Sequence, residues 1–180
     1  MVKEEHIRRA NTSDAQTLSD LSKITFFDTF KDTCSAKDMQ GFIHEYFNVE
    51  LIKKELQDPD DFYFISFING MATGYIRLKE DSSNVEIIAN HKAIELKRIY
   101  VLKEYHSQKV GAALMNFALG FAATKNYEMI WLGVWEHNER AKRFYKKFGF
   151  EDTGAKHSFP IGNTPQTDNW LYKFISHNNQ

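Results

Sequence analysis

Two features between Ile94 and Ala113 could bind a phosphorylated ligand. In the first half of this stretch the apolar alternation breaks, because Ile99 follows Leu96 by three positions instead of two or four. An extra residue of this kind predicts a β-bulge, which turns backbone groups away from the neighbouring strand and toward another partner. The second half, Gln108–Ala113, places small residues where a helix begins, and helix starts favour anions such as phosphates.

The elements before this stretch are predicted from periodicity and turn signals. Ser13 and Gln16 are spaced as a capping box and predict a helix that continues to Phe30. The pair Asn69-Gly70 between two β-rich runs predicts a hairpin, and the polar segment 79–92 reads as a loop. The other predicted elements here are a strand at 6–9, helices at 36–47 and 49–57, and hairpin strands at 62–68 and 71–78.

The second half of the chain alternates helices and strands. The unbroken apolar run 129–135 predicts a strand covered on both faces at the centre of a sheet. Asn138 can cap a helix that ends at Gly149. The remaining predicted elements are a helix at 110–125 and strands at 150–153 and 169–175. The order, without repeats or a composition break, predicts one mixed α/β domain over residues 1–180.

Composition excludes several classes of function. With 180 residues, 23 basic and 24 acidic side chains, the chain has no global charge that would favour nucleic acid or an anionic membrane. The single cysteine, Cys34, excludes an internal disulfide and fits a reducing compartment. The start of the chain has no apolar signal region, and no segment is apolar over the roughly 18 residues of a membrane span. We therefore expect a cytoplasmic protein that binds neither nucleic acid nor membrane.

Other ligand motifs are absent from the sequence. A dinucleotide site needs three spaced glycines at a strand-to-helix turn, and only Gly111 is present. No G-x-x-x-x-G-K-[ST] run exists for nucleoside triphosphates, and the seven histidines lack zinc-binding spacing, so we expect no metal.

Two linked motifs resemble the GNAT superfamily of acyl-CoA-dependent N-acetyltransferases, in the right order and spacing. The first is the strand end Arg98–Val101 followed by Gln108-x-x-Gly111-x-Ala113, and the second is the strand 131–135 followed by Asn138–Phe150. The segments Phe26–Phe30, Phe159–Gly162 and Gln166–Asp168 are similar to the bacterial spermidine/spermine N-acetyltransferases of this superfamily.

The resemblance implies the GNAT fold, a central and mostly antiparallel sheet of about seven strands with splayed central strands and helices on both faces. It also implies acetyl-CoA as the cofactor. The pantetheine arm would enter between the splayed strands, and the pyrophosphate would lie on the amides at the helix start, where Ala113 replaces the commoner glycine. The cofactor-binding residues carried over are Ile99, Tyr100, Val101, Gln108, Lys109, Val110, Gly111, Ala112, Ala113, Asn138 and Lys147.

The motif match makes Tyr145 the candidate proton donor to the departing thiolate, because a phenol and a thiol have similar pKa values. A backbone N–H of Ile99 or Tyr100 would meet the oxyanion. Glu95, on the bulged strand, is a candidate base that acts directly or through water, although alternation leaves open whether it faces the cleft or solvent.

The resemblance favours direct transfer of acetyl to a primary amine in a ternary complex, and the small-molecule acceptor it indicates is a polyamine such as spermidine or spermine. Carboxylates that could hold a cationic amine are Asp28, Asp32, Glu45 and Asp168. Three alternatives stay open: a protein or peptide N-acetyltransferase, a non-catalytic acyl-CoA-binding module, and, for the assembly, a homodimer.

Overall fold

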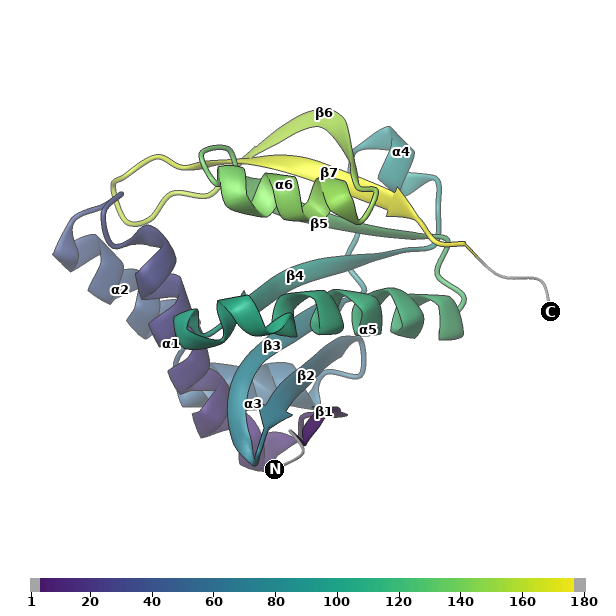
Figure 1. Cartoon of the computed structure of the whole chain (residues 1–180). Helices are drawn as coiled ribbons and strands as arrows, with labels where there is room; N and C mark the ends of the chain where they lie inside the picture. Colours follow the sequence, from purple (N-terminus) through teal and green to yellow (C-terminus); the bar gives the residue numbers. More distant parts are fainter. Residues whose placement is uncertain (1–3, 177–180) are drawn as a thin grey trace.

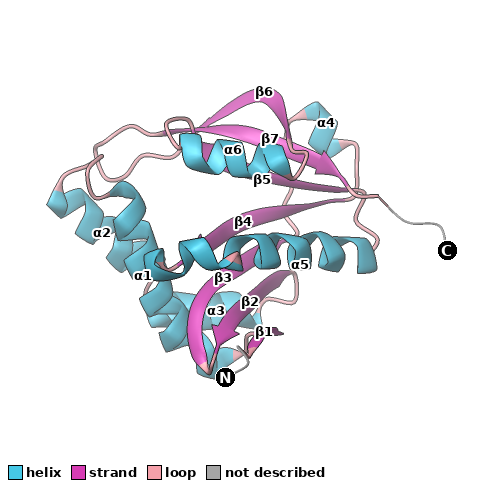
Figure 2. Ribbon diagram, in the orientation of Figure 1, coloured by secondary structure: helices cyan, strands magenta, loops and turns pink. Residues whose placement is uncertain are grey.

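The computed structural model describes residues 4–176, and seven of its strands form one sheet in the order β1-β2-β3-β4-β5-β7-β6 (Figures 1 and 2). All neighbouring strands are antiparallel except β4 and β5, which are parallel. The strands are β1 (Glu5–Arg9), β2 (Asp61–Ile68), β3 (Met71–Lys79), β4 (Ala93–Val101), β5 (Met129–Trp135), β6 (Glu151–Ser158) and β7 (Thr167–Phe174). The predicted mixed, mostly antiparallel sheet is therefore confirmed.

Helices cover both faces of this sheet, as predicted (Figure 1). One core contains apolar residues of α5, α6 and the sheet, and a second contains residues of α1, α3 and the opposite face of β2 and β3. The helices are α1 (Ala15–Phe30), α2 (Ala36–Tyr46), α3 (Val49–Gln57), α4 (Glu86–Ala89), α5 (Val110–Thr124) and α6 (Glu139–Lys147), with 3₁₀ turns at Thr12–Asp14 and Lys103–Gln108.

The hairpin and the buried central strand are confirmed. Asn69 and Gly70 take φ angles of 49° and 79°, the left-handed values that a tight two-residue turn between β2 and β3 requires. The run Met129–Trp135 forms β5 inside the sheet, between β4 and β7. Apolar side chains on both faces of β5 are buried, as an unbroken apolar strand requires.

Two details differ from the sequence predictions. The cap at the start of the first helical segment is Asn11, whose side chain accepts from Ser13 N–H while the Asp14 carboxylate accepts from Asn11 N–H, so the predicted Ser13–Gln16 box is wrong. Arg8 favours this choice because it pairs with Asp14 at 2.7 Å. The polar segment 79–92 also contains α4, which packs Ile88 against Met129 and Trp131.

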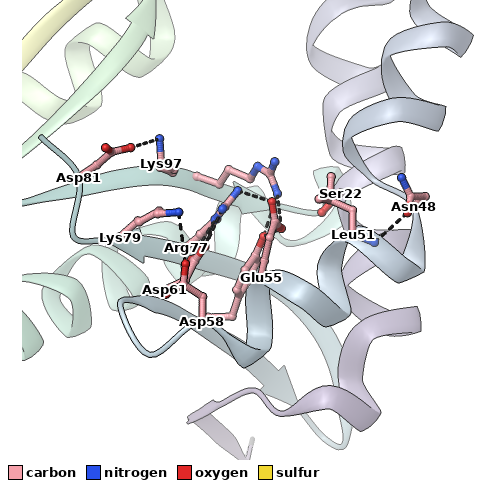
Figure 3. Close-up of polar contacts among 12 residues, drawn as sticks. Ser22, Asn48, Leu51, Glu55, Asp58, Asp61, Arg77, Lys79, Asp81 and Lys97 are labelled. Carbon is pink, nitrogen blue, oxygen red and sulfur yellow. Dashed lines mark hydrogen bonds and ion pairs between the residues drawn. The ribbon is translucent and has the colours of Figure 1, made fainter. Parts of the chain in front are cut away.

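A buried network of charges connects α3 to β2 and β3 (Figure 3). The Arg77 guanidinium lies 2.6 Å from Asp61 and 2.8 Å from Glu55, both measured between nitrogen and carboxylate oxygen. The Tyr63 hydroxyl donates to Glu55 and accepts from Arg98 of β4. These carboxylates therefore have cationic partners within the fold.

Within residues 4–176, none of the helices has the length and apolar character that crossing a lipid bilayer would require.

Candidate active site

The central strands β4 and β5 separate along their length, which opens the sheet. They pair only at Ala93–Met129, Ile94–Ile130 and Glu95–Trp131, and beyond these positions the two strands diverge (Figure 1). On its other side β4 carries the predicted bulge, because Arg77 faces Arg98 while Leu78 faces Leu96, which leaves Lys97 as the extra residue. The splayed geometry is therefore built into the central strands.

A cavity of about 1140 Å³ lies at this divergence. Its wall includes residues of β4, the start of α5, the end of β5 and α6, and it continues to α1, α2 and Phe159. The cavity can therefore take a long ligand from one side and a second molecule from the other.

The start of α5 forms one wall. Lys109 precedes the helix with a left-handed φ of 63°, a conformation that turns successive backbone amides toward one point. A Cβ built on Gly111 would make only ordinary van der Waals contacts, with Val101 at 3.8 Å and Phe144 at 3.9 Å, so the protein around it does not by itself require a glycine here. Lys109, Gly111 and Ala112 line the cavity.

Most of the predicted cofactor-binding residues meet at this cavity. Those that line it are Ile99, Tyr100, Val101, Lys109, Gly111, Ala112, Asn138 and Lys147. Gln108 and Ala113 lie beside the cavity but outside its lining, and Val110 is fully buried in the core under α5.

Besides Lys109 and Lys147, which the sequence predicted, the same wall contains basic side chains that sequence reasoning did not assign to the site, namely Lys103, His106, His137 and Arg140. His106 joins the two sides of this wall, since its ring nitrogens lie 2.9 Å from the Val101 carbonyl oxygen and 2.8 Å from Arg140 Nη1. The basic residues of the lining near α5 and α6 are Lys103, His106, Lys109, His137, Arg140 and Lys147. The lysines and the arginine of this group suit a ligand with several phosphates.

Tyr145 reaches the cavity from α6. Asn138 caps this helix by accepting from Ala141 N–H at 3.0 Å. One turn further on, Tyr145 is 8% exposed and contacts the rings of Phe144 and Phe150. Burial, and then the charge of Asp168, raise the pKa of the Tyr145 hydroxyl, so this group stays protonated and available as a proton donor.

The two candidate site carboxylates on the sheet, Asp168 and Glu95, differ in position. Asp168, on β7, lines the cavity, whereas Glu95 lies at the last paired position of β4 and β5 and is outside the lining. Oε2 of Glu95 lies 2.7 Å from the ammonium of Lys97. Burial raises the pKa of Glu95, and Lys97 opposes this rise.

The other predicted acidic residues lie on helices or after them. Asp28 is exposed at the cavity rim on α1. Asp32 and Glu45 are exposed and are not part of the cavity lining. Their predicted place in the acceptor site is therefore wrong, since the alternation of residues within short polar segments does not fix the direction of their side chains. The structure thus brings Asp28 and Asp168 together with Tyr145 in one cavity.

Aromatic side chains form a further part of the cavity wall. Phe26 stacks on Phe42 at 4.6 Å, and Phe30 contacts Trp135 at 5.3 Å and Phe159 at 5.9 Å, measured between ring centroids. All five line the cavity.

A family model described as the acetyltransferase (GNAT) family matches residues 20–150. An uncharacterized N-acetyltransferase of Lactobacillus delbrueckii subsp. lactis is 34% identical over 156 residues, which is 86% of this chain and 88% of the relative. The spermidine N(1)-acetyltransferase of Thermoplasma acidophilum is 31% identical over 153 residues, covering 82% of this chain and 89% of the relative.

The structure is also similar to the crystal structure of the PaiA N-acetyltransferase of Thermoplasma acidophilum in complex with coenzyme A. The TM-score is 0.77 at 22% identity, over 95% of this chain and 99% of that one.

Proposed function

Since the chain belongs to the acetyltransferase (GNAT) family and is an acetyl-CoA-dependent N-acetyltransferase, we propose that its acceptor is a primary amine of a polyamine such as spermidine or spermine. One observation carries this proposal: the part of the cavity lined by Phe26, Phe30 and Phe159 also contains a partly buried carboxylate, that of Asp168. We call this part of the lining the acceptor wall. The carboxylate attracts the ammonium group, and the rings suit the methylene segments and the cationic charge of a polyamine. The spermidine-named relative supports the same acceptor class.

The residues of the wall near α5 and α6 fit acetyl-CoA, which supplies the acetyl thioester when bound. Gly111 has no side chain that would separate a ligand from the backbone at the start of α5, where amides and the helix dipole favour a pyrophosphate. The basic side chains of this wall suit further phosphate oxygens. Tyr145 donates a proton to the departing sulfur, and the two ligands meet in one cavity, which favours direct transfer in a ternary complex.

An acceptor screen that measures thiol release from acetyl-CoA tests this proposal. The panel contains spermidine, spermine, phenethylamine as an aromatic monoamine, and a lysine-containing peptide with a free N-terminus. We expect the highest kcat/KM for a polyamine. Turnover of phenethylamine or of the peptide, with no turnover of either polyamine, would assign the acceptor site to another amine class.

A further inference from the structure

The acceptor amine must lose a proton before it can react. An alkylamine has a pKa near that of lysine, about 10.4, so it arrives as an ammonium at neutral pH and only its neutral form attacks a carbonyl. A group that takes this proton has to face the cavity near the Tyr145 hydroxyl, because both act on the same reacting centre.

Asp168 has this position because of a glycine on the neighbouring strand. In the β5–β7 register Asp168 faces Trp135, yet its side chain leans two residues along β5 and covers Gly133. A Cβ on Gly133 would lie 2.8 Å from Oδ2 of Asp168, closer than real Cβ contacts come. Gly133 therefore provides the room that directs the carboxylate into the cavity, and both residues line it.

The carboxylate of Asp168 has no hydrogen bond or ion pair with any residue of the described range 4–176. The titratable groups that face it are Glu95 and Tyr100 of β4 and Tyr145 of α6, and His157 of β6 is its backbone neighbour. Lys97 lies against Glu95 at 2.7 Å and compensates that carboxylate instead. Among the residues that the structure describes, Asp168 thus has no cationic partner, and its oxygens are free to meet a cation in the cavity.

We propose that Asp168 is the catalytic residue that removes the proton from the ammonium of the acceptor. This inference rests on the amine acetylation described above, and it holds for any amine that the site accepts.

Protons and bonds balance with two residues of this chain. Asp168 takes the first proton of the ammonium, and the freed lone pair of the nitrogen forms the C–N bond to the acetyl carbon. As the C–S bond breaks, the sulfur receives a proton from Tyr145, and the second proton of the nitrogen restores the Tyr145 hydroxyl. Asp168 then releases its proton to solvent, so one amine is acetylated, one thiol is formed and one proton is released.

The surroundings of Asp168 also tune its basicity. Burial, and then the charge of Glu95, raise the pKa of Asp168 to about 7. A base whose pKa lies near the working pH combines an ionised form with a useful driving force for proton transfer.

The test is the pH dependence of kcat/KM, measured by thiol release between pH 5.5 and 9.5 with the best amine of the screen. For the wild type we expect a limb that rises through about pH 7. Asp168→Asn should lower kcat/KM at pH 7 by at least about 100-fold and abolish this limb, with unchanged affinity for acetyl-CoA. Asp152→Asn, an exposed carboxylate on the adjacent strand β6, is the matched control and should leave the profile unchanged.

Gly133→Ala is a second variant that keeps Asp168 but displaces its carboxylate, and we expect a loss of kcat/KM with unchanged acetyl-CoA affinity. Two results would overturn the proposal: a rising limb that persists in Asp168→Asn, or a raised amine KM in that variant with kcat and its pH profile unchanged. If no polyamine reacts but another amine does, the acceptor proposal fails while this test proceeds with that amine.

Discussion

Two groups of carboxylates lie against the same sheet, and they differ in whether a cationic side chain pairs with them. Behind β2 and β3, Asp61 and Glu55 are paired with the Arg77 guanidinium (Figure 3). The Tyr63 hydroxyl donates to Glu55 and accepts from Arg98. At the divergence of β4 and β5, Asp168 lies in the cavity wall, where burial and then the charge of Glu95 raise the pKa of its carboxyl group.

The difference separates structure from function. A buried carboxylate with a well-aligned arginine is neutralised within the fold, and breaking such a pair is costly. A carboxylate that faces another carboxylate raises the free energy of the folded protein when it ionises, and a cationic ligand relieves that cost. We interpret the carboxylates paired with Arg77 as part of the scaffold, and Asp168 as a binding site for the ammonium group of the acceptor.

Removal of the Tyr145 and Tyr63 hydroxyl groups should show the largest difference between a loss of activity and a loss of stability. Tyr145→Phe removes the proton donor and should lower kcat by about 10²- to 10⁴-fold with little change in acetyl-CoA affinity or unfolding free energy. Tyr63→Phe removes a partner of Glu55 and Arg98 and should instead cost about 1–3 kcal/mol of stability. Steady-state kinetics and urea unfolding of both variants check this, and unchanged turnover in Tyr145→Phe would exclude it as the acid.

Arg77→Met should destabilise the protein by about 3–5 kcal/mol, because Asp61 and Glu55 would stay buried without a counter-charge. Lys79→Met is the matched control, since the Lys79–Asp58 pair is longer, at 3.5 Å, and partly exposed, so its loss should cost less than about 1 kcal/mol. If Arg77→Met and Lys79→Met lost the same unfolding free energy in urea, the interpretation of the Arg77 network as scaffold would be contradicted.

Asp168→Asn should increase the free energy of unfolding in the same assay, whereas Arg77→Met lowers it. The folded-state pKa of Asp168 is raised, to about 7, so the native protein binds more protons than the unfolded chain below that pH and loses stability as the pH rises toward 7. At pH 8 the variant should be more stable by up to about 4 kcal/mol, at 1.36 kcal/mol per pKa unit. The gain should vanish near pH 4, and a variant less stable than the wild type at pH 8 would show that the charge is compensated.

Two glycines that lie against Val101, Gly74 and Gly111, allow the same comparison for steric space instead of charge. A Cβ on Gly74 would lie 2.6 Å from the Tyr100 carbonyl oxygen, whereas a Cβ on Gly111 meets nothing closer than 3.8 Å. Gly74→Ala should therefore destabilise the sheet, while Gly111→Ala should fold normally and weaken acetyl-CoA binding about tenfold, or about 1.4 kcal/mol. Calorimetric titration checks this, and unaltered affinity in Gly111→Ala would argue against the phosphate loop.

Local patterns were sufficient for much of the fold and for one half of the site. The hairpin follows from Asn69-Gly70 and the bulge from the spacing of Leu96 and Ile99, because both depend on neighbours in the sequence. The position of Asp168 could not be predicted in this way. It depends on the pairing of β5 with β7 and on the space above Gly133, which are long-range features.

The exposed positions of Asp32 and Glu45 show the same limit from the other side. Their residue type suits a cationic substrate, but the orientation of a side chain near a helix end follows from packing against α1 and α2. Polar surface residues carry little periodic signal about that packing.

The most direct test of the unpaired carboxylate is an NMR titration of the protein with ¹³C-labelled aspartate carboxyl groups, in which Asp168→Asn identifies the signal of Asp168. We expect a midpoint for Asp168 near pH 7, and a lower midpoint when a non-reactive amine analogue of the acceptor occupies the cavity. A midpoint near 3.9, the ordinary pKa of aspartate, would contradict the account.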